Sequence, residues 1–122
     1  MATAAQARKK LMAYALRFPE AYEDHPWGED VVKVNKKIFV FFGVPEGASF
    51  GCTTKLPESR EFAMTFPFTE PSGYGLGKAG WISSTFAKGT DIPVDMLMDW
   101  IDESYRAVAP KKLVELLDGG TP

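Results

Sequence analysis

The sequence predicts one α+β domain built on an antiparallel sheet. Its 122 residues are 45% hydrophobic and 13% aromatic, which is enough for a single core without disulfides. Apolar residues recur with helical spacing near both ends of the chain, whereas β-branched and aromatic runs joined by short turns fill the middle. We expect the order helix, three strands, helix, strand, helix and helix, in one domain over residues 1–122 with a flexible tail at about residues 119–122.

The first expected helix covers residues 4–17 and is amphipathic. Thr3 and Gln6 have the spacing of a capping box, and Pro19 ends the helical pattern. Residues 19–30 are rich in Pro, Gly and acidic side chains and are expected to form a loop. The apolar face of the helix consists of Leu11, Tyr14, Ala15 and Phe18.

Three strands are expected next, because β-branched and aromatic runs follow one another. Asn35 and Lys36 break the first run, which predicts a tight hairpin turn since Asn tolerates a left-handed backbone. The second strand is apolar on both faces, so we expect it to be central and covered on both sides. One of its faces would carry Ile38, Val40 and Phe42, and the other Phe39 and Phe41. The three strands span residues 31–34, 37–44 and 49–56.

The second half of the chain is expected to add three helices and one strand. Pro57 is well placed to open a short helix over residues 57–66, with Phe62 and Phe66 on one side. Pro93 suits the first turn of a long helix with an apolar stripe. The other elements are a loop at residues 67–80, a strand at 81–87, the long helix at 94–108 and a terminal helix at 111–117 that stops at Gly119-Gly120.

Charge is unevenly distributed along the chain, although its net value is only −2. Residues 31–90 carry seven basic against four acidic side chains, whereas residues 91–118 carry seven acidic against three basic ones. The basic middle could orient the domain toward an anionic partner. The alternative is that the helices are simply acidic, since the net charge is far from that of a dedicated nucleic-acid binder.

One cysteine and one histidine limit the chemistry that the chain can perform. A single cysteine forms no internal disulfide, and the two residues cannot make a Cys/His zinc cage. No apolar run is long enough to cross a membrane or to act as a signal peptide. We therefore expect a cytoplasmic protein without a cofactor, a metal or a membrane partner.

No set of side chains in the sequence has the pattern of an active site. His25 lies in an expected loop and is interpreted as structural or exposed, although it could pair with a neighbouring carboxylate. Cys52 lies in the middle of an apolar strand, which predicts a buried and unreactive thiol. Asp24, Glu29 and Asp30 could bind a hard cation together, but they lack the alternating ligands of a calcium loop. The sequence favours a protein that is not an enzyme.

The glycine-rich residues 73–81, GYGLGKAGW, contain the pattern G-x-G-x-x-G at Gly75, Gly77 and Gly80. A dinucleotide-binding loop would place such glycines between a strand and a helix, whereas here the following residues are β-branched and aromatic. A P-loop fails too, because the residue after the lysine is neither Ser nor Thr. We interpret the glycines as letting the backbone bend before Trp81 and placing Lys78 at the rim of the sheet.

Lysines recur beside aromatic residues at the ends and turns of the expected strands. Such lysines can reach phosphate oxygens while aromatic rings offer stacking surfaces. The alternative is that they keep strand edges soluble and prevent edge-to-edge pairing. The candidate nucleic-acid-binding residues are Lys33, Lys36, Lys37, Lys55 and Lys78.

Several motifs occur in the order found in one family of small bacterial domains. HPWGEDVVKVNKKIFVFF, TTKLPES, YGLGKAGW and IPVDMLMDWIDESYRAV together resemble the MmcQ/YjbR family over about residues 8–110. The resemblance implies a CyaY-like fold with a curved antiparallel sheet, and a double-wing arrangement like that of DNA-binding proteins. It also implies that Lys33 and Lys37 match the lysines flanking the family's first hairpin turn, that Lys55 matches the lysine ending its third strand, and that Tyr105 matches an S-Y helix motif.

The glycine-rich segment both matches and departs from the family. Tyr74, Lys78 and Trp81 match the tyrosine, lysine and tryptophan of a Y-H-M-N-K-x-H-W-like segment. Glycines replace its two histidines and its asparagine in this chain. The resemblance therefore implies nothing about the role of those polar side chains here.

Two main functions follow from the sequence. The first is a non-enzymatic domain that binds DNA through the hairpin lysines and Lys78. The second is a small-molecule or protein-partner domain, in which an aromatic-lined concavity with one cation takes an acidic ligand. A structural or adaptor role without a soluble ligand is a third hypothesis, and we expect a monomer or a weak dimer. The residues of the second site are Trp27, Tyr74, Lys78 and Trp81.

Overall fold

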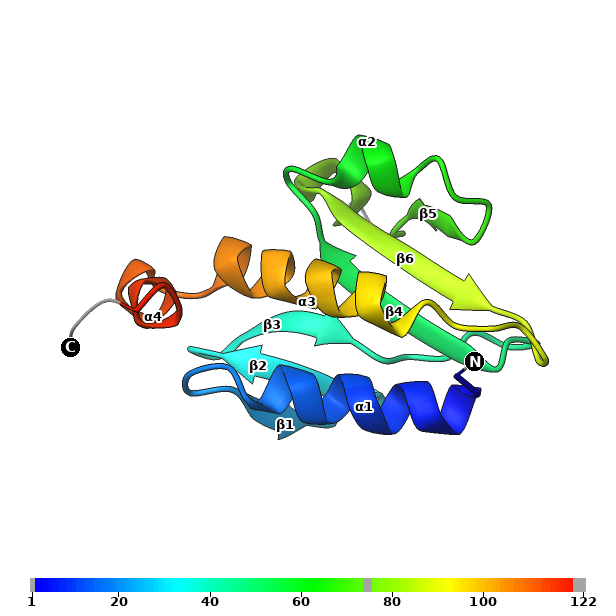
Figure 1. Cartoon of the computed structure of the whole chain (residues 1–122), viewed down its shortest axis with the longest axis horizontal. Coiled ribbons are helices and arrows are strands. Elements are labelled where there is room, and N and C mark those ends of the chain that lie inside the picture. Colours follow the sequence, from blue (N-terminus) through cyan, green and yellow to red (C-terminus); the bar gives the residue numbers. More distant parts are fainter. Residues whose placement is uncertain (1, 74–75, 120–122) are drawn as a thin grey trace.

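A computed structural model of the chain describes residues 2–73 and 76–119, apart from the side chain of Trp27 (Figure 1). Most of the expected tail, residues 120–122, lies outside the described residues. In chain order the elements are α1 (Ala4–Leu16), β1 (Tyr22–Asp24), η1 (Pro26–Gly28), β2 (Val31–Val34), β3 (Lys37–Phe41), β4 (Phe50–Lys55), α2 (Arg60–Ala63), β5 (Thr69–Pro71), η2 (Leu76–Ala79), β6 (Trp81–Phe86), α3 (Val94–Val108) and α4 (Lys111–Leu117), where η marks a short 3-10 helix.

The strands form one six-stranded antiparallel sheet in the order β1-β2-β3-β4-β6-β5. This confirms the predicted α+β class with helices packed on an antiparallel sheet. The structure adds β1 and β5 to the predicted order, as three-residue edge strands inside segments that the sequence predicted to be loops. These short segments become strands by pairing with β2 and β6, and three residues are too few to show a periodicity in the sequence.

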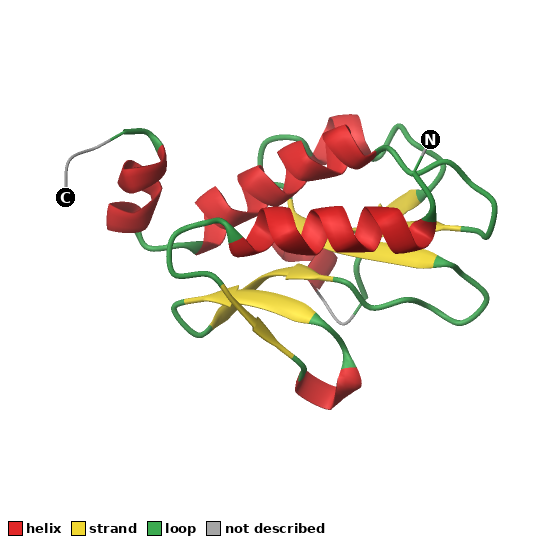
Figure 2. Ribbon diagram, turned by 60° about the horizontal axis from the view of Figure 1, so that its bottom comes forward, coloured by secondary structure: helices red, strands yellow, loops and turns green. Residues whose placement is uncertain are grey.

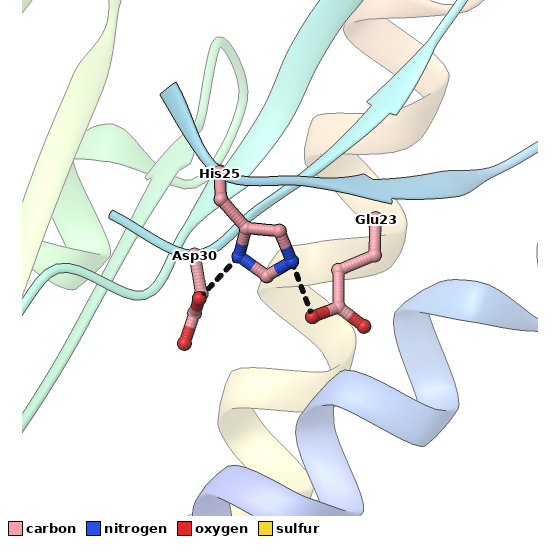
Figure 3. Close-up of side chains that lie close together, drawn as sticks. All are labelled: Glu23, His25 and Asp30. Carbon is pink, nitrogen blue, oxygen red and sulfur yellow. Dashed lines mark hydrogen bonds and ion pairs between the residues drawn. The ribbon is translucent and has the colours of Figure 1, made fainter. Parts of the chain in front are cut away.

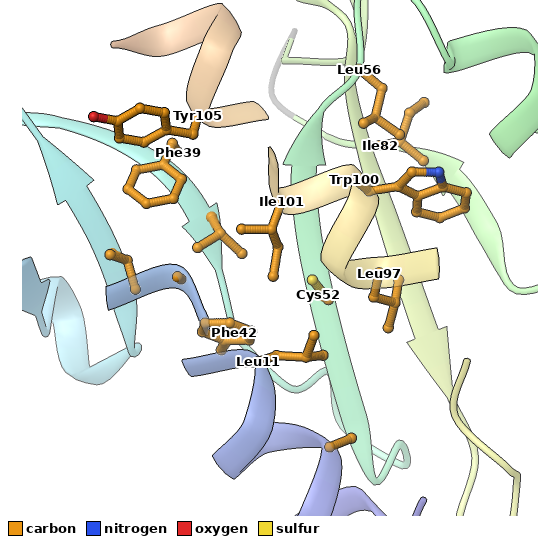
Figure 4. Close-up of a cluster of buried hydrophobic side chains, with 14 of the residues drawn as sticks. Leu11, Phe39, Phe42, Cys52, Leu56, Ile82, Leu97, Trp100, Ile101 and Tyr105 are labelled. Carbon is orange, nitrogen blue, oxygen red and sulfur yellow. The ribbon is translucent and has the colours of Figure 1, made fainter. Parts of the chain in front are cut away.

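Both long helices cover the same face of the sheet (Figure 2). α1 packs beside α3 and against β2, while α3 packs over β3 and β4. The main core lies between these helices and the sheet, where Phe39, Ile101 and Tyr105 are fully buried (Figure 4). We call this helix-covered side the inner face and the opposite side the outer face. Within the described residues no helix combines the length and the apolar character needed to cross a membrane.

α1 begins at the capping box that the sequence predicted. The Thr3 hydroxyl accepts a hydrogen bond from the Gln6 backbone amide at 3.2 Å, and the Thr3 amide donates to the Gln6 side chain at 3.0 Å. The apolar spacing then places Leu11 and Ala15 in the core. Local sequence signals were sufficient for this helix.

A β-bulge changes which residues of β3 face the core. Val32 pairs with Val40, but its neighbour Lys33 pairs with Ile38, so Phe39 is an extra residue in β3. Phe39 and Val40 are consequently both buried in the same core cluster. The prediction that these two side chains face opposite ways is wrong, because the bulge interrupts the two-residue alternation of the strand.

α2 is shorter than the helix predicted for residues 57–66. The backbone amides of Glu58 and Ser59, just before the helix, donate to the carboxylate of Glu103 on α3 at 2.9 and 3.0 Å. Only Arg60–Ala63 are helical. A tertiary contact with α3 thus anchors the residues that precede this helix.

Candidate functional site

All five candidate lysines lie at one end of the sheet. The β2–β3 turn carries Lys36 and Lys37, and antiparallel pairing sets the last residue of β4, Lys55, beside the first residue of β6, Trp81. The start of β3 and the end of β4 lie at the same end because these strands run in opposite directions. Lys78 in η2 comes three residues before β6. We call this end, defined by Lys33, Lys36, Lys37, Lys55 and Lys78, the lysine end.

The lysine end has two arms that diverge from each other (Figure 1). The hairpin arm consists of β2 and β3, and the β4–β6 arm consists of β4, β6 and η2. The two arms are joined by backbone pairing only at Val40–Thr54 and Phe41–Thr53. Beyond Thr54 the strands separate toward the lysines, so each arm presents its own basic side chains.

A tight two-residue turn closes the hairpin arm, as the sequence predicted. Val34 pairs with Lys37, and both residues between them have positive φ, 50° for Asn35 and 66° for Lys36. This is the signature of a type I′ turn, whose twist matches that of the flanking strands. Glycine is the favoured residue at its second central position, yet this position is occupied by Lys36. Both lysines of the turn are exposed.

Lys33 differs from the turn lysines because it is already paired. Alternation with the buried Val32 and Val34 places it on the outer face, where its Nζ lies 2.7 Å from Oδ2 of Asp24 on β1. The hydrogen bond between the two side chains raises the pKa of Lys33 and lowers the pKa of Asp24. The positive charge of Lys33 is therefore largely compensated by the Asp24 carboxylate.

Lys55 is held by a buried serine that the sequence analysis did not single out. The Ser104 hydroxyl donates to the Phe39 carbonyl at 2.5 Å and accepts from the Lys55 amide at 2.8 Å. In a continuous β3–β4 ladder these two backbone groups would be neighbours. Ser104 therefore takes the place of a strand-to-strand hydrogen bond at the point where the arms separate. The sequence did contain a signal for this contact, because Ser104 is a polar residue within the apolar stripe of the helix predicted at residues 94–108.

The glycine-rich segment brings Lys78 to the rim of the β4–β6 arm. Gly80 has a φ of 95°, and its carbonyl accepts a hydrogen bond from the Leu56 amide at 2.9 Å. A Cβ on Gly77 would lie 2.8 Å from Cβ of Pro71, so the backbone approaches β5 too closely for a larger residue. Lys78 itself is exposed. A strand follows the segment, as expected for a bent connection and not for a dinucleotide loop; Gly75 lies outside the described residues.

Of the four residues of the alternative ligand site, the structure describes the side chains of two, Lys78 and Trp81. Trp81 is 8% exposed and packs edge-on against Phe41 on the outer face, with ring centroids 5.4 Å apart. Its ring is thus largely used in packing, whereas Lys78 is open to solvent. Tyr74 and the side chain of Trp27 lie outside the described residues.

His25 lies between two carboxylates (Figure 3). Its Nδ1 is 2.6 Å from Oδ1 of Asp30, and its Nε2 is 3.1 Å from Oε2 of Glu23. Both ring nitrogens therefore face carboxylate acceptors. Glu23, His25 and Asp30 are close enough together to resemble a metal site. The carboxylates, however, lie against opposite ring nitrogens, and Asp30 also pairs with Arg8 of α1.

Asp24, Glu29 and Asp30, which the sequence suggested could bind a cation together, do not share one site. Asp24 pairs with Lys33, and Asp30 pairs with Arg8 and His25. The Glu29 carboxylate instead lies over Gly43, where a Cβ would be 3.0 Å from its Oε1. The three carboxylates therefore have separate partners.

Cys52 is buried, as the sequence predicted. Its side chain is 1% exposed in the core, and desolvation raises the pKa of its thiol to about 12. The reactive thiolate is therefore scarce at neutral pH.

Comparison with protein families gives the chain a family. The YjbR family model matches residues 16–107, about three quarters of the sequence. The chain belongs to the YjbR family. The family assignment includes both arms of the lysine end, η2 and all of α3 except its last residue. No curated protein matches the chain.

A solved structure has the same fold. The crystal structure of Deinococcus radiodurans protein DR2400, with the family-model domain DUF419, superimposes with a TM-score of 0.69 over 93% of this chain and 88% of that one. The two sequences are 21% identical. The comparison thus supports the architecture, with its open antiparallel sheet and packed helices, and nothing finer.

Proposed function

We propose that this YjbR-family protein is a non-enzymatic nucleic-acid-binding domain, whose lysine end contacts the phosphate backbone of DNA. The observation that carries the proposal is the β2–β3 turn. Lys36 adopts a φ of 66°, a conformation that costs an ordinary L-residue about 1 kcal/mol and costs glycine nothing. A charged side chain is therefore held at the tip of the hairpin at a position where the fold alone would favour glycine.

The free charge of the lysine end comes from both arms. Among the ion pairs of residues 2–73 and 76–119, none involves Lys36, Lys37, Lys55 or Lys78. Two of these lysines lie on the hairpin arm and two on the β4–β6 arm. An extended polyanion can neutralise both arms at once, which a single small anion cannot do.

One of the two helices on the inner side, α3, has the opposite charge character, whereas α1 beside it is basic, with Arg8, Lys9 and Lys10. Exposed or partly exposed faces of α3 carry Asp95, Asp99 and Asp102, which would repel phosphate. Charge segregation of this kind orients a domain with low net charge, so a formal charge of −2 is compatible with binding at one end. Contacts by lysine to phosphate carry no base information, so we expect little sequence preference.

A salt titration of duplex binding tests the proposal. Four free lysines predict that log K falls with log salt at a slope of about 3.6, since each neutralised phosphate contributes about 0.9. Fluorescence anisotropy of a labelled duplex of mixed sequence supplies the affinity at each salt concentration. A flat salt dependence, or no binding at low salt, would contradict the proposal.

A pair of double variants locates the contact. Lys36→Ala/Lys37→Ala removes two charges from the lysine end and is expected to reduce the salt slope by about 2. Lys10→Ala/Lys88→Ala removes the same charge from α1 and from the opposite end of β6, and is expected to leave the slope unchanged. Equal losses in both variants would show that only net charge matters and would remove the lysine end from the function.

A further inference from the structure

A hollow lies on the outer face of the sheet, between the β3–β4 loop and the segment that joins β5 to η2. Its volume is about 510 Å³, which is within the range of small-molecule sites. Phe41 of β3, Thr53 of β4 and Ser83 of β6 are cross-strand neighbours in one row, so their side chains share this face. We call it the outer-face hollow, defined by Glu29, Phe41, Val44, Thr53, Leu76 and Ser83.

Two exposed apolar side chains line the hollow from opposite sides. A Cβ on Gly51 would overlap the carbonyl oxygen of Gly43, so glycine at this position of β4 lets the β3–β4 loop cross over the strand and form one wall. Val44 of this loop is 46% exposed, and Leu76 of η2 is 37% exposed on the other side. Single exposed apolar residues are ordinary, but these two adjoin one concave site together with the Phe41 ring. The hollow therefore offers apolar surface to an occupant.

Three hydroxyl groups form a hydrogen-bonded chain in the hollow. The Ser83 Oγ lies 3.0 Å from Oγ1 of Thr53 and 2.8 Å from Oγ of Ser72, and all three side chains are partly buried. Three hydroxyls hold three protons, of which the two hydrogen bonds use two. One proton is therefore left to be donated to an occupant, and the remaining lone pairs can accept. The chain can bind a hydroxyl or an amide group.

The charge of the lining is negative. Glu29 is the one charged side chain among the described residues that line the hollow, and no ion pair of the described residues involves it. A second carboxylate borders the same row, because Glu70 of β5 is the cross-strand neighbour of Ser83 and is exposed. The lining therefore favours a cationic group in an occupant.

The two nearest candidate lysines lie outside the hollow. Lys55 is two residues from Thr53 along β4, about 7 Å, and its cross-strand neighbour is Trp81. The Trp81 ring packs edge-on against Phe41 and bounds the hollow on the side of the lysine end. Lys78 follows Leu76 by two residues in η2, and the turn of a 3-10 helix directs such side chains to different sides.

We propose that the outer-face hollow binds a small organic amine that has an apolar body and a hydroxyl or amide group. The ammonium group would pair with the Glu29 carboxylate. The apolar body would pack on Phe41 between Val44 and Leu76, and the polar group would hydrogen-bond with the hydroxyl chain. An acidic ligand of the same shape would instead meet an uncompensated carboxylate.

This site is separate from the proposed nucleic-acid contact, because phosphate and an amine require opposite charges on the protein. Duplex binding depends on the lysine end, whereas amine binding depends on Glu29. A flat salt titration of duplex binding would leave the amine site untouched. Loss of amine binding would likewise leave the salt dependence of duplex binding untouched.

Three probes of similar shape test the charge preference. Tyramine, tyrosol and phloretate share a phenol ring on a short chain that ends in an ammonium, a hydroxyl and a carboxylate group, respectively. Each is titrated into the full-length protein while backbone amide shifts are followed by NMR, and the amides of Thr53, Leu76 and Ser83 are expected to respond. We expect tyramine to bind about two- to fivefold more tightly than tyrosol, as for an ion pair open to solvent, and phloretate to bind most weakly.

Matched variants assign each part of the site. Glu29→Gln is expected to abolish the preference for tyramine over tyrosol, whereas Glu61→Gln removes the same charge outside the hollow and should preserve it. Leu76→Ser is expected to weaken all three probes, whereas Leu116→Ser removes a side chain that is 40% exposed on α4 and should weaken none.

The hydroxyl chain is tested with phenethylamine, which lacks the phenol hydroxyl of tyramine. The double variant Thr53→Val/Ser83→Ala is expected to weaken tyramine about two- to tenfold and to leave phenethylamine unchanged, because the lost hydrogen bond involves only the phenol. The amide spectrum shows whether each variant remains folded.

The proposal is overturned if no probe shifts the amides of the hollow, if phloretate binds as tightly as tyramine, or if Glu29→Gln and Glu61→Gln act alike. Equal effects of the double variant on tyramine and phenethylamine would also contradict it. It is overturned as well if these amides shift with protein concentration and not with probe concentration, because the hollow would then face a second copy of this chain.

Discussion

The two arms of the lysine end present the same kind of side chain by different physical means. The hairpin arm owes its shape to a local turn between paired strands, with two residues at positive φ. The β4–β6 arm depends on distant contacts: Ser104 holds the Lys55 amide from α3, and Gly80 brings η2 against Leu56. The turn of the first arm is therefore encoded by neighbouring residues, whereas the backbone position of Lys55 in the second arm depends on Ser104 of α3.

This difference predicts how substitutions in each arm will affect the exposed charge and the stability of the protein. A change in the hairpin turn alters the exposure of charge with little effect on the core. A change at the junction between the arms alters stability and the position of Lys55 together, because Ser104 bonds to both strands. The following predictions test that contrast in order of decreasing effect.

Phe39→Ala is expected to have the largest effect, lowering the free energy of unfolding by about 3–5 kcal/mol. Phe39 is fully buried and packs against Tyr105 and Phe18, with ring centroids 5.1 and 6.1 Å away, so it joins the hairpin arm to α3 and the end of α1. Urea unfolding followed by circular dichroism measures the change. The neighbouring outer-face variant Ile38→Ala is expected to cost clearly less, and an equal cost would show that the bulge does not direct Phe39 inward.

Ser104→Ala is expected to lower the free energy of unfolding by about 1–3 kcal/mol, because it leaves the Phe39 carbonyl and the Lys55 amide without their shared partner. The separation of the arms should then fluctuate more. Labelling of the buried Cys52 thiol by a maleimide under native conditions measures this opening, and it should become faster. Ser49→Ala removes a half-buried hydroxyl that donates to the Phe86 carbonyl and serves as the control; labelling that accelerates equally in both variants would contradict a special role for Ser104.

Lys36→Gly is expected to raise the free energy of unfolding by about 1 kcal/mol, since glycine adopts positive φ without strain. The same change should weaken duplex binding and reduce its salt slope by about 1. Stability and affinity would thus move in opposite directions. Lys37→Gly is the control: it lies in β3 and should lower both quantities, because glycine weakens a strand. A Lys36→Gly variant that binds duplex as tightly as the parent would separate the turn from the proposed function.

Acidification is expected to have the smallest effect on the arms. The pKa of Asp24 is lowered mainly by its hydrogen bond with Lys33, so the pair stabilises the folded state at neutral pH and is lost as pH falls through that lowered pKa. Asp24→Asn should therefore flatten this part of the pH profile of urea unfolding. The same variant frees Lys33 and should increase the salt slope of duplex binding. No change in either measurement would show that the pair contributes nothing in solution.

The limits of prediction from sequence follow the same contrast between local and distant contacts. The capping box at Thr3, the turn at Asn35-Lys36 and the periodicity of α3 are signals within a few residues, and each gave the correct element. The edge strands β1 and β5 and the bulge at Phe39 depend on pairing with another strand, and the short α2 lies against Glu103 of α3. The local sequence at these positions carries no sign of these features, so it suggests a loop or a regular strand instead.

All the candidate lysines could be identified from the sequence, but their arrangement in space could not. The sequence by itself determined the α+β class, the long helices, the buried Cys52 and the type of side chain available for binding. Only the tertiary structure decided that five lysines from four segments meet at one end of the sheet, that Lys33 is paired with Asp24, and that Phe62 stays exposed. The physical reason is that helices and turns are stabilised by neighbouring residues, whereas strand order, ion pairing and burial are set by the packing of the whole chain.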